Sequence, residues 1–141
     1  MPEKVDLEVE LPRANFAPFL ARWVLKTFIA DRVASYLLTD AELLVSELAN
    51  NALLHCRRHI TLRASLDEKR LLVEVSDEGD GVERDLNSAH FEQLSGWGLD
   101  LVEHISSRWG IHEQAPHVWF ELELAERHEP RPRLRKQVAP V

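Results

Sequence analysis

The chain has 141 residues, of which 45% are hydrophobic and 29% charged, and its formal net charge at pH 7 is −7. This composition is typical of one globular domain that buries its own core. The acidic body disfavours nucleic-acid binding, and no apolar run is long enough to span a membrane. The single cysteine, Cys56, excludes an internal disulfide framework and a Cys-rich metal site. With no secretory-signal pattern at the N-terminus, we expect a cytoplasmic protein.

Charge is distributed unevenly along the chain. Residues 127–141 contain five basic residues and one acidic residue, and prolines interrupt them. We therefore expect a single domain over residues 1–126, followed by a basic, proline-containing, disordered tail over 127–141. A solvated tail is favoured over one that binds an acidic partner.

The first part of the chain predicts one strand and two helices. Apolar residues alternate with polar ones from Val5 to Leu11, which predicts a strand that ends before Pro12. Apolar residues then recur at helical spacing over 15–29, a stretch that includes Trp23. The capping-box pattern Thr-Asp-Ala-Glu over 39–42 predicts a second helix that begins there and extends to about Cys56.

The second part predicts a hairpin, a long loop, a helix and a closing hairpin. Strand-like segments over 60–66 and 71–76 are joined by a charged turn over 67–69. No periodicity is sustained over 77–98, which predicts a functional loop. The apolar spacing from Leu99 to Trp109 predicts a helix that ends at Gly110, and 111–113 pairs with 118–124. We expect Trp23, Trp109 and Trp119 in the core.

These elements predict an α+β two-layer sandwich, in which three helices cover one face of a mixed, mostly antiparallel sheet. A Rossmann fold is excluded because a hairpin turn, and not a helix, links the adjacent strands over 60–76.

Three polar residues interrupt the second predicted helix on a face that should be apolar. Asn51 and His55 share a stripe with Leu44 and Leu48, and Glu47 borders it. Burying such groups without partners is costly, so we expect a polar ligand to meet them. A hydrogen-bonded network at the edge of the helix is an equally good interpretation of this helix alone.

Two glycine motifs follow. Asp77-x-Gly79-x-Gly81 comes directly after a strand, where glycines permit close approach of a ligand and a carboxylate can accept a hydrogen bond from an exocyclic amine. Gly96-Trp97-Gly98-Leu99 opens the next helix, whose N–H groups can bind phosphate. Taken alone, each motif is equally typical of a surface turn or a hinge.

The order of these motifs is specific. Glu47-x-x-x-Asn51-x-x-x-His55, Asp77-x-Gly79-x-Gly81 and Gly96-x-Gly98-Leu99 resemble the N, G1 and G2 boxes of GHKL (Bergerat-fold) ATPases. Over residues 44–124 the chain looks in particular like the anti-sigma-factor serine/threonine kinases of the RsbW type. The short sequence motifs typical of that subfamily are Val45-Ser46-Glu47-Leu48, Ser107-Arg108-Trp109-Gly110 and Val118-Trp119-Phe120-Glu121-Leu122.

The resemblance implies a site for ATP and Mg²⁺. Asn51 would coordinate Mg²⁺, and Glu47 would be the general base that takes a proton from a serine or a water. Asp77 would select adenine, and residues 82–95 would form a lid over the phosphates. His55 either lies near the phosphates or is an edge histidine with a partner of its own. The main-chain contacts would come from Gly79, Gly81, Gly96, Trp97, Gly98 and Leu99.

Three features depart from the subfamily pattern. Trp97 occupies a position that is often small or basic, which removes a potential phosphate partner. Pro116 and His117 replace a Lys-Thr or Thr-Thr pair that helps to hold the adenine end. The predicted lid is acidic, with Asp80, Glu83, Asp85 and Glu92 against Arg84.

The resemblance implies a kinase that binds Mg·ATP, regulates a sigma factor and phosphorylates a serine on an anti-sigma-factor antagonist. It also implies homodimers, with the helix over 15–29 as a candidate dimer or partner surface. The alternative is a non-catalytic protein-binding module on the same fold. The catalytic half of a split histidine kinase is disfavoured because residues 1–40 contain no phosphoacceptor histidine. A gyrase- or chaperone-type ATPase is disfavoured because no transducer domain follows.

Overall fold

The computed structural model describes residues 4–55, 59–77, 99–112 and 117–124. The predicted lid, Cys56 and the basic tail lie outside these ranges. The strands are β1 (Val5–Leu11), β2 (Ile60–Leu66), β3 (Arg70–Asp77), β4 (Arg108–His112) and β5 (His117–Glu123). The helices are α1 (Ala17–Ile29), α2 (Ser35–His55) and α4 (Leu99–Ile105).

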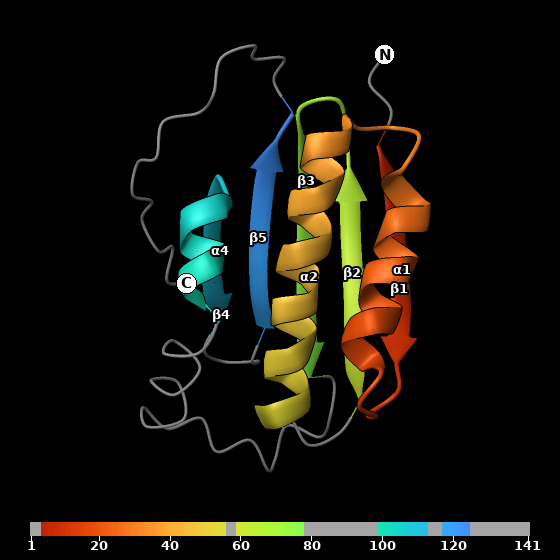
Figure 1. Cartoon of the computed structure of the whole chain (residues 1–141), viewed down its shortest axis with the longest axis vertical. Helices are drawn as coiled ribbons and strands as arrows, with labels where there is room; N and C mark the ends of the chain where they lie inside the picture. The colour runs from red at the N-terminus through yellow and green to blue at the C-terminus, as the bar shows by residue number, and fades with distance from the viewer. Residues whose placement is uncertain (1–3, 56–58, 78–98, 113–116, 125–141) are drawn as a thin grey trace.

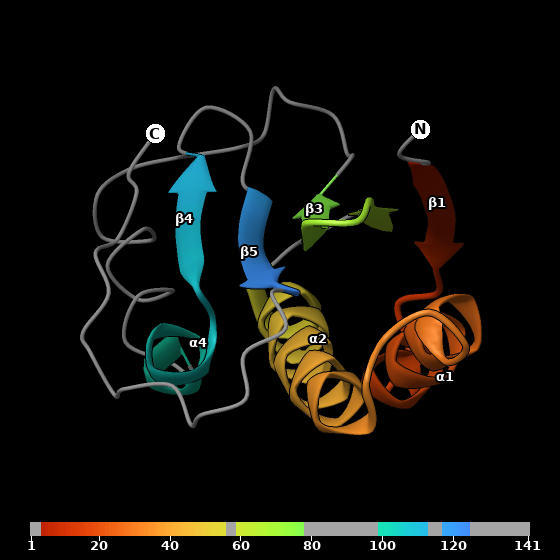
Figure 2. The same ribbon diagram turned by 90° about the horizontal axis from the view of Figure 1, so that it is seen from above.

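The strands form one sheet in the order β1-β2-β3-β5-β4, and all neighbouring strands are antiparallel (Figure 1). Viewed along the strands, the three helices cover the same face of this sheet (Figure 2). The predicted α+β two-layer architecture is therefore confirmed. In the part of the chain that is described, no helix is both long and apolar enough to cross a membrane.

The core lies between the sheet and α2. Successive side chains of a strand point to opposite faces of the sheet, so every second residue of each strand faces the helices. Phe120, in the middle of β5, is fully buried and pairs across the sheet with Val73 and Trp109. Leu44 and Leu48 of α2 belong to the same buried cluster. Trp109 is thus a core residue, as predicted. The prediction that Trp119 lies in the core is wrong: it follows from strand alternation that Trp119, next to buried Phe120, is on the other face of the sheet, where it is partly buried and the Arg108 guanidinium lies 5.8 Å from its ring centroid.

The predicted helix over 15–29 is confirmed, but the prediction that Trp23 is on its core-facing side is wrong. Trp23 is 56% exposed, and the residues that α1 buries are Ala17, Ala21, Leu25 and Ile29. These four residues are spaced four apart and form their own helical face. Two alanines on that face allow α1 to approach the neighbouring helix closely, which leaves the larger aromatic side chains outside.

The second helix begins one turn earlier than predicted. α2 starts at Ser35, and the Thr39 hydroxyl donates a hydrogen bond to the Ser35 carbonyl at 3.2 Å. Thr39 is therefore a residue of the helix interior and not the predicted cap. The physical reason is that Leu37, which is 5% exposed, extends the buried face of the helix by one turn before Ala41.

The predicted helix from Leu99 to Trp109 is too long. α4 ends at Ile105, and Trp109 and Gly110 belong to β4. The Ser107 N–H already donates to the Glu121 carbonyl at 2.8 Å, so pairing with β5 begins there. Trp109 and Ile111 alternate toward the core, each 3% exposed, and this strand pairing prevails over the local helical spacing.

The predicted charged turn joins β2 to β3. Asp67 Oδ1 accepts hydrogen bonds from the backbone N–H groups of Lys69 (2.7 Å) and Arg70 (2.9 Å). The bonds from Arg70 and then Lys69 hold the pKa of Asp67 below its ordinary value of 3.8. A lowered carboxyl pKa stabilises the fold at neutral pH, and this stabilisation is lost as the pH falls through the lowered value.

We therefore expect Asp67→Ala to lower the urea midpoint at neutral pH, with a difference from the native protein that narrows below pH 3.8. Urea titrations across a pH series measure it. Glu68→Ala, in the same turn, is the matched control and should show neither effect. An Asp67→Ala difference that is constant with pH would contradict the role of the carboxylate.

Candidate functional site

Polar residues interrupt the buried stripe of α2, as predicted from the sequence. Leu44 and Leu48 are 0% and 1% exposed, and Asn51, one turn further along, is 3% exposed. Glu47 precedes Asn51 by four residues and is partly buried beside this stripe. An amide and a carboxylate thus share one face of α2, close to the apolar core.

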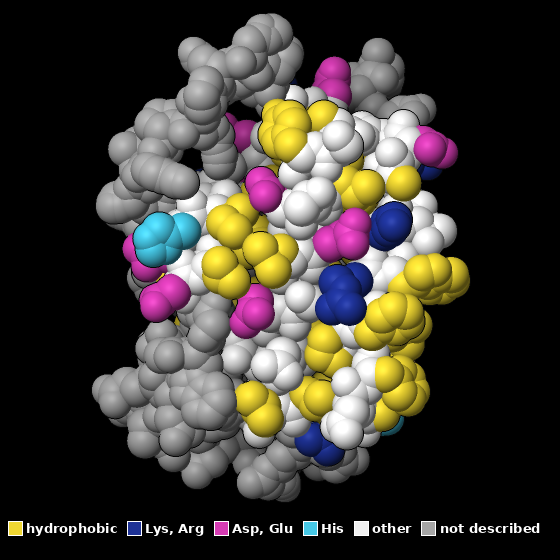
Figure 3. All heavy atoms as spheres, viewed as in Figure 1, with side chains coloured by type: hydrophobic (Ala, Val, Ile, Leu, Met, Phe, Trp, Pro, Cys, Tyr) yellow, Lys and Arg dark blue, Asp and Glu magenta, His cyan; other side chains and the backbone are white. Residues whose placement is uncertain are grey.

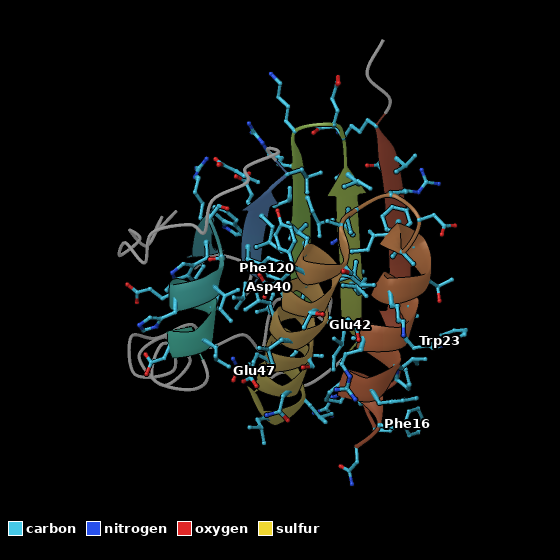
Figure 4. All side chains as sticks on the ribbon, turned by 45° about the horizontal axis from the view of Figure 1, so that its top comes forward. Phe16, Trp23, Asp40, Glu42, Glu47 and Phe120 are labelled. Atoms are coloured by element: carbon cyan, nitrogen blue, oxygen red, sulfur yellow. The ribbon has the colours of Figure 1, made fainter. Side chains whose placement is uncertain are left out.

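Glu47 lies on the side of α2 that faces α4 (Figure 4). α4 packs against α2 and β4. Its first residue, Leu99, is the last residue of the second glycine motif. The structure therefore brings the helix that begins at Leu99 next to the helix that carries Glu47 and Asn51.

The C-terminal ends of α2 and β3 lie at the same end of the sheet (Figure 1). His55 is the last residue of α2, and Asp77 is the last residue of β3. Asp77 pairs with Ile60, which follows His55 by only five residues. Of the elements that carry predicted site residues, α2 therefore packs against both β3 and α4.

The described part of the predicted site is incomplete. The side chains of His55, Asp77 and Leu99 are not described, and Gly79, Gly81, Gly96, Trp97 and Gly98 lie outside the described residues. The roles assigned to all of these residues stay predictions.

Sequence reasoning did not single out Asp100, which is exposed in the first turn of α4. Its position directly after Leu99, the last residue of the second glycine motif, could have identified it as a residue near the predicted site. An acidic residue is favourable at the N-terminus of a helix. Its carboxylate also adds negative charge beside the predicted phosphate position, as the acidic residues of the predicted lid do.

The side-chain chemistry of α2 suits a hard cation. The Glu47 carboxylate and the Asn51 amide offer the oxygen ligands that Mg²⁺ prefers. Within residues 4–55, 59–77, 99–112 and 117–124, no three His, Cys, Asp or Glu side chains are grouped to hold a metal ion. In nucleotide sites Mg²⁺ usually keeps several waters and is bound by one or two protein oxygens together with substrate phosphates.

Comparison with protein families identifies a domain family that covers most of the chain. Residues 13–121 match the histidine kinase-like ATPase domain, a range that includes α1, α2, α4 and strands β2 to β4. No curated protein matches the chain. The two-layer architecture and the polar face of α2 agree with the family match, and membership of the family implies ATP binding. The chain belongs to the histidine kinase-like ATPase domain family, within the GHKL superfamily.

Proposed function

We propose that this domain is a serine/threonine protein kinase of the anti-sigma-factor type, which binds Mg·ATP and phosphorylates a serine on an anti-sigma-factor antagonist while it regulates a sigma factor. The observation that carries the proposal is the pair on α2: partly buried Glu47, on the side of α2 that faces α4, lies one turn before buried Asn51. The sequence motifs around Glu47, Trp109 and Phe120, which resemble those of the anti-sigma-factor kinases, support a kinase function over other functions within the family.

The two side chains have separate roles in the proposed reaction. Glu47 accepts the proton of the serine hydroxyl as its oxygen bonds to the γ-phosphorus, and the bond from that phosphorus to ADP breaks. Asn51 would hold Mg²⁺ through its amide oxygen, and an ion bound there would supply positive charge that stabilises the transferred phosphate.

Isothermal titration of the native protein with ATP, with and without Mg²⁺, tests the nucleotide part of the proposal. We expect binding that Mg²⁺ strengthens, and we expect Asn51→Ala to weaken Mg·ATP binding by about tenfold or more, about 1.4 kcal/mol. Asn50→Ala is the matched control, because Asn50 is the adjacent asparagine on the exposed side of α2 and should bind Mg·ATP normally.

A pull-down from the native host followed by transfer of radiolabelled phosphate identifies the partners. Labelled phosphoserine on a captured antagonist supports the kinase. If the native protein binds no Mg·ATP yet captures the same partners, the domain is a non-catalytic binding module and the kinase proposal is wrong.

A further inference from the structure

The sheet has one face that no described element covers. Helices α1, α2 and α4 lie on the other face, and the apolar residues of β1 pack against the core on that side (Figure 2). Asp6, Glu8 and Glu10 alternate with these apolar residues, so their side chains lie on the uncovered face, which we call the open face. Among the residues that the structure describes, every helix and strand is accounted for by the sheet and the helix layer.

β1 gives the open face a row of three carboxylates at the edge of the sheet. Asp6 accepts a hydrogen bond from the Ser65 hydroxyl at 2.7 Å, and the Glu8 carboxylate lies 3.5 Å from Nε of Arg63. The side chains of Glu8 and Glu10 are nevertheless 65% and 61% exposed. Each carboxylate is therefore held from the side of β2 and is still largely accessible to a cation from solvent.

The open face as a whole is acidic. Its described strand residues include six acidic side chains, the three of β1 together with Glu74, Glu121 and Glu123, against three arginines. α1, on the opposite face, has only basic charges, Arg22 and Lys26. Figure 3 shows Lys and Arg side chains (dark blue) on the helix side, over the part where α1 lies. A basic segment near β1 is therefore attracted to the open face and repelled from the helix side.

The basic tail, residues 127–141, has a charge pattern that matches the row on β1. Arg131, Arg133 and Arg135 occur at every second position, as the three carboxylates do. A residue that precedes proline is restricted to extended conformations, so Pro130 and Pro132 favour an extended chain here. In an extended chain, side chains two residues apart point to the same side at intervals of about 6.6–6.8 Å. The arginines then repeat at the spacing of the carboxylates.

The tail begins within reach of β1. β5 ends beside the β2–β3 turn, where Glu123 pairs with Arg70, and β1 begins beside the same turn. β1 lies three strand spacings from β5, which is about 14 Å. The seven-residue step from Leu124 to Arg131 spans up to about 23–25 Å when extended. The arginines can therefore reach β1 and run along it from its first residue.

We propose that the basic tail lies over β1 on the open face of its own sheet, with its three alternating arginines against the three carboxylates. The tail runs in the direction of β1, so that Arg131 meets Asp6 and Arg135 meets Glu10. Exposed ion pairs are individually weak, so the contact depends on all three pairs and on the short connection, which keeps the local concentration of the tail high. A basic segment of another protein binds to this row only by displacing the tail.

A spin label on the tail locates it in the full chain. Cys56→Ser removes the only cysteine, and Leu134→Cys then carries a nitroxide between two of the arginines. At about 50 mM salt we expect the amide NMR signals of residues 6–10 to lose most of their intensity, relative to the reduced label, and those of 99–105 to keep theirs. About 1 M salt, where the Debye length is about 3 Å, should restore the β1 signals. Equal intensities for the two segments at low salt overturn the proposal.

A mixture of chains tests whether the tail lies on its own sheet. Chains enriched in ¹⁵N without the spin label are mixed with unenriched chains that carry it. We expect the ¹⁵N chains to keep the full intensity of their β1 signals. A loss of intensity there means that the tail lies on another copy, and the proposed intramolecular contact is then wrong.

Charge reversal tests the pairing along the row. Arg133→Glu and Glu8→Lys should each restore most of the β1 signal of the spin-labelled chain, and the chain that carries both should lose it again, because unlike charges face each other once more. Asp31→Lys is the matched control, since it reverses an exposed charge between α1 and α2, and should leave the signal loss unchanged. If the double variant behaves like either single one, Arg133 does not face Glu8 and the proposed alignment is wrong.

Discussion

Glu47→Gln is expected to reduce phosphoryl transfer to the antagonist by about 10²–10⁴-fold, the usual contribution of a general base. Glutamine keeps the shape and the hydrogen-bonding oxygen of the side chain but cannot accept a proton. Affinity for Mg·ATP should stay within about twofold, because the proposed metal ligand, Asn51, is intact. Single-turnover transfer from radiolabelled ATP, with titration calorimetry in parallel, separates the two effects.

Glu42→Gln provides the control for this variant. Glu42 is also a partly buried glutamate of α2, but it lies more than one turn earlier in the helix than Glu47 (Figure 4). Its transfer rate should equal that of the native protein. If Glu47→Gln transfers phosphate at the native rate, Glu47 is not the base. If Glu47→Gln loses Mg·ATP binding as well, the side chain belongs to the nucleotide site in another role.

Phe120→Ala is expected to lower the free energy of unfolding by about 3–5 kcal/mol. Phe120 is fully buried in β5, between Val73 on β3 and Trp109 on β4, so its removal leaves a cavity at the centre of the sheet. A loss of this size is a large part of the stability of a small domain. Urea unfolding followed by circular dichroism measures it.

Two further variants show that the loss comes from the core. Phe120→Leu keeps most of the buried volume and should cost much less, below about 1.5 kcal/mol. Glu123→Ala removes an exposed side chain from the same strand and should change stability by no more than about 0.5 kcal/mol. Equal losses for Phe120→Ala and Glu123→Ala would mean that Phe120 is not at the packing centre.

Local patterns were sufficient to predict much of the fold. The β2–β3 hairpin follows from the alternation of apolar and polar residues on both sides of a turn. In that turn Asp67 accepts hydrogen bonds from the backbone N–H groups of Lys69 and Arg70. The errors occur where a distant segment decides the structure. Ile105 and Trp109 fit a helix by spacing, yet the pairing of Trp109 with Phe120 across the β4–β5 hairpin places Trp109 in a strand.

The same distinction applies to the surface and the candidate site. Trp23 is of a residue type that is often buried, but Ala17 and Ala21 face the core in its place because they fit closely against the neighbouring helix. For the site, spacing alone placed Glu47 and Asn51 on one face of α2. That α4 lies beside them follows from tertiary packing, which no local pattern contains.

The strand order has a consequence for how the chain becomes a folded protein. Among the residues that the structure describes, β5 is the last strand in sequence, but it lies between β3 and β4 in the sheet. Until residue 123 leaves the ribosome, β3 has an open edge and β4 has no strand to pair with. Completion of the sheet therefore waits for β5, and a chain that ends prematurely before His117 leaves the edge of β3 unpaired and open to aggregation.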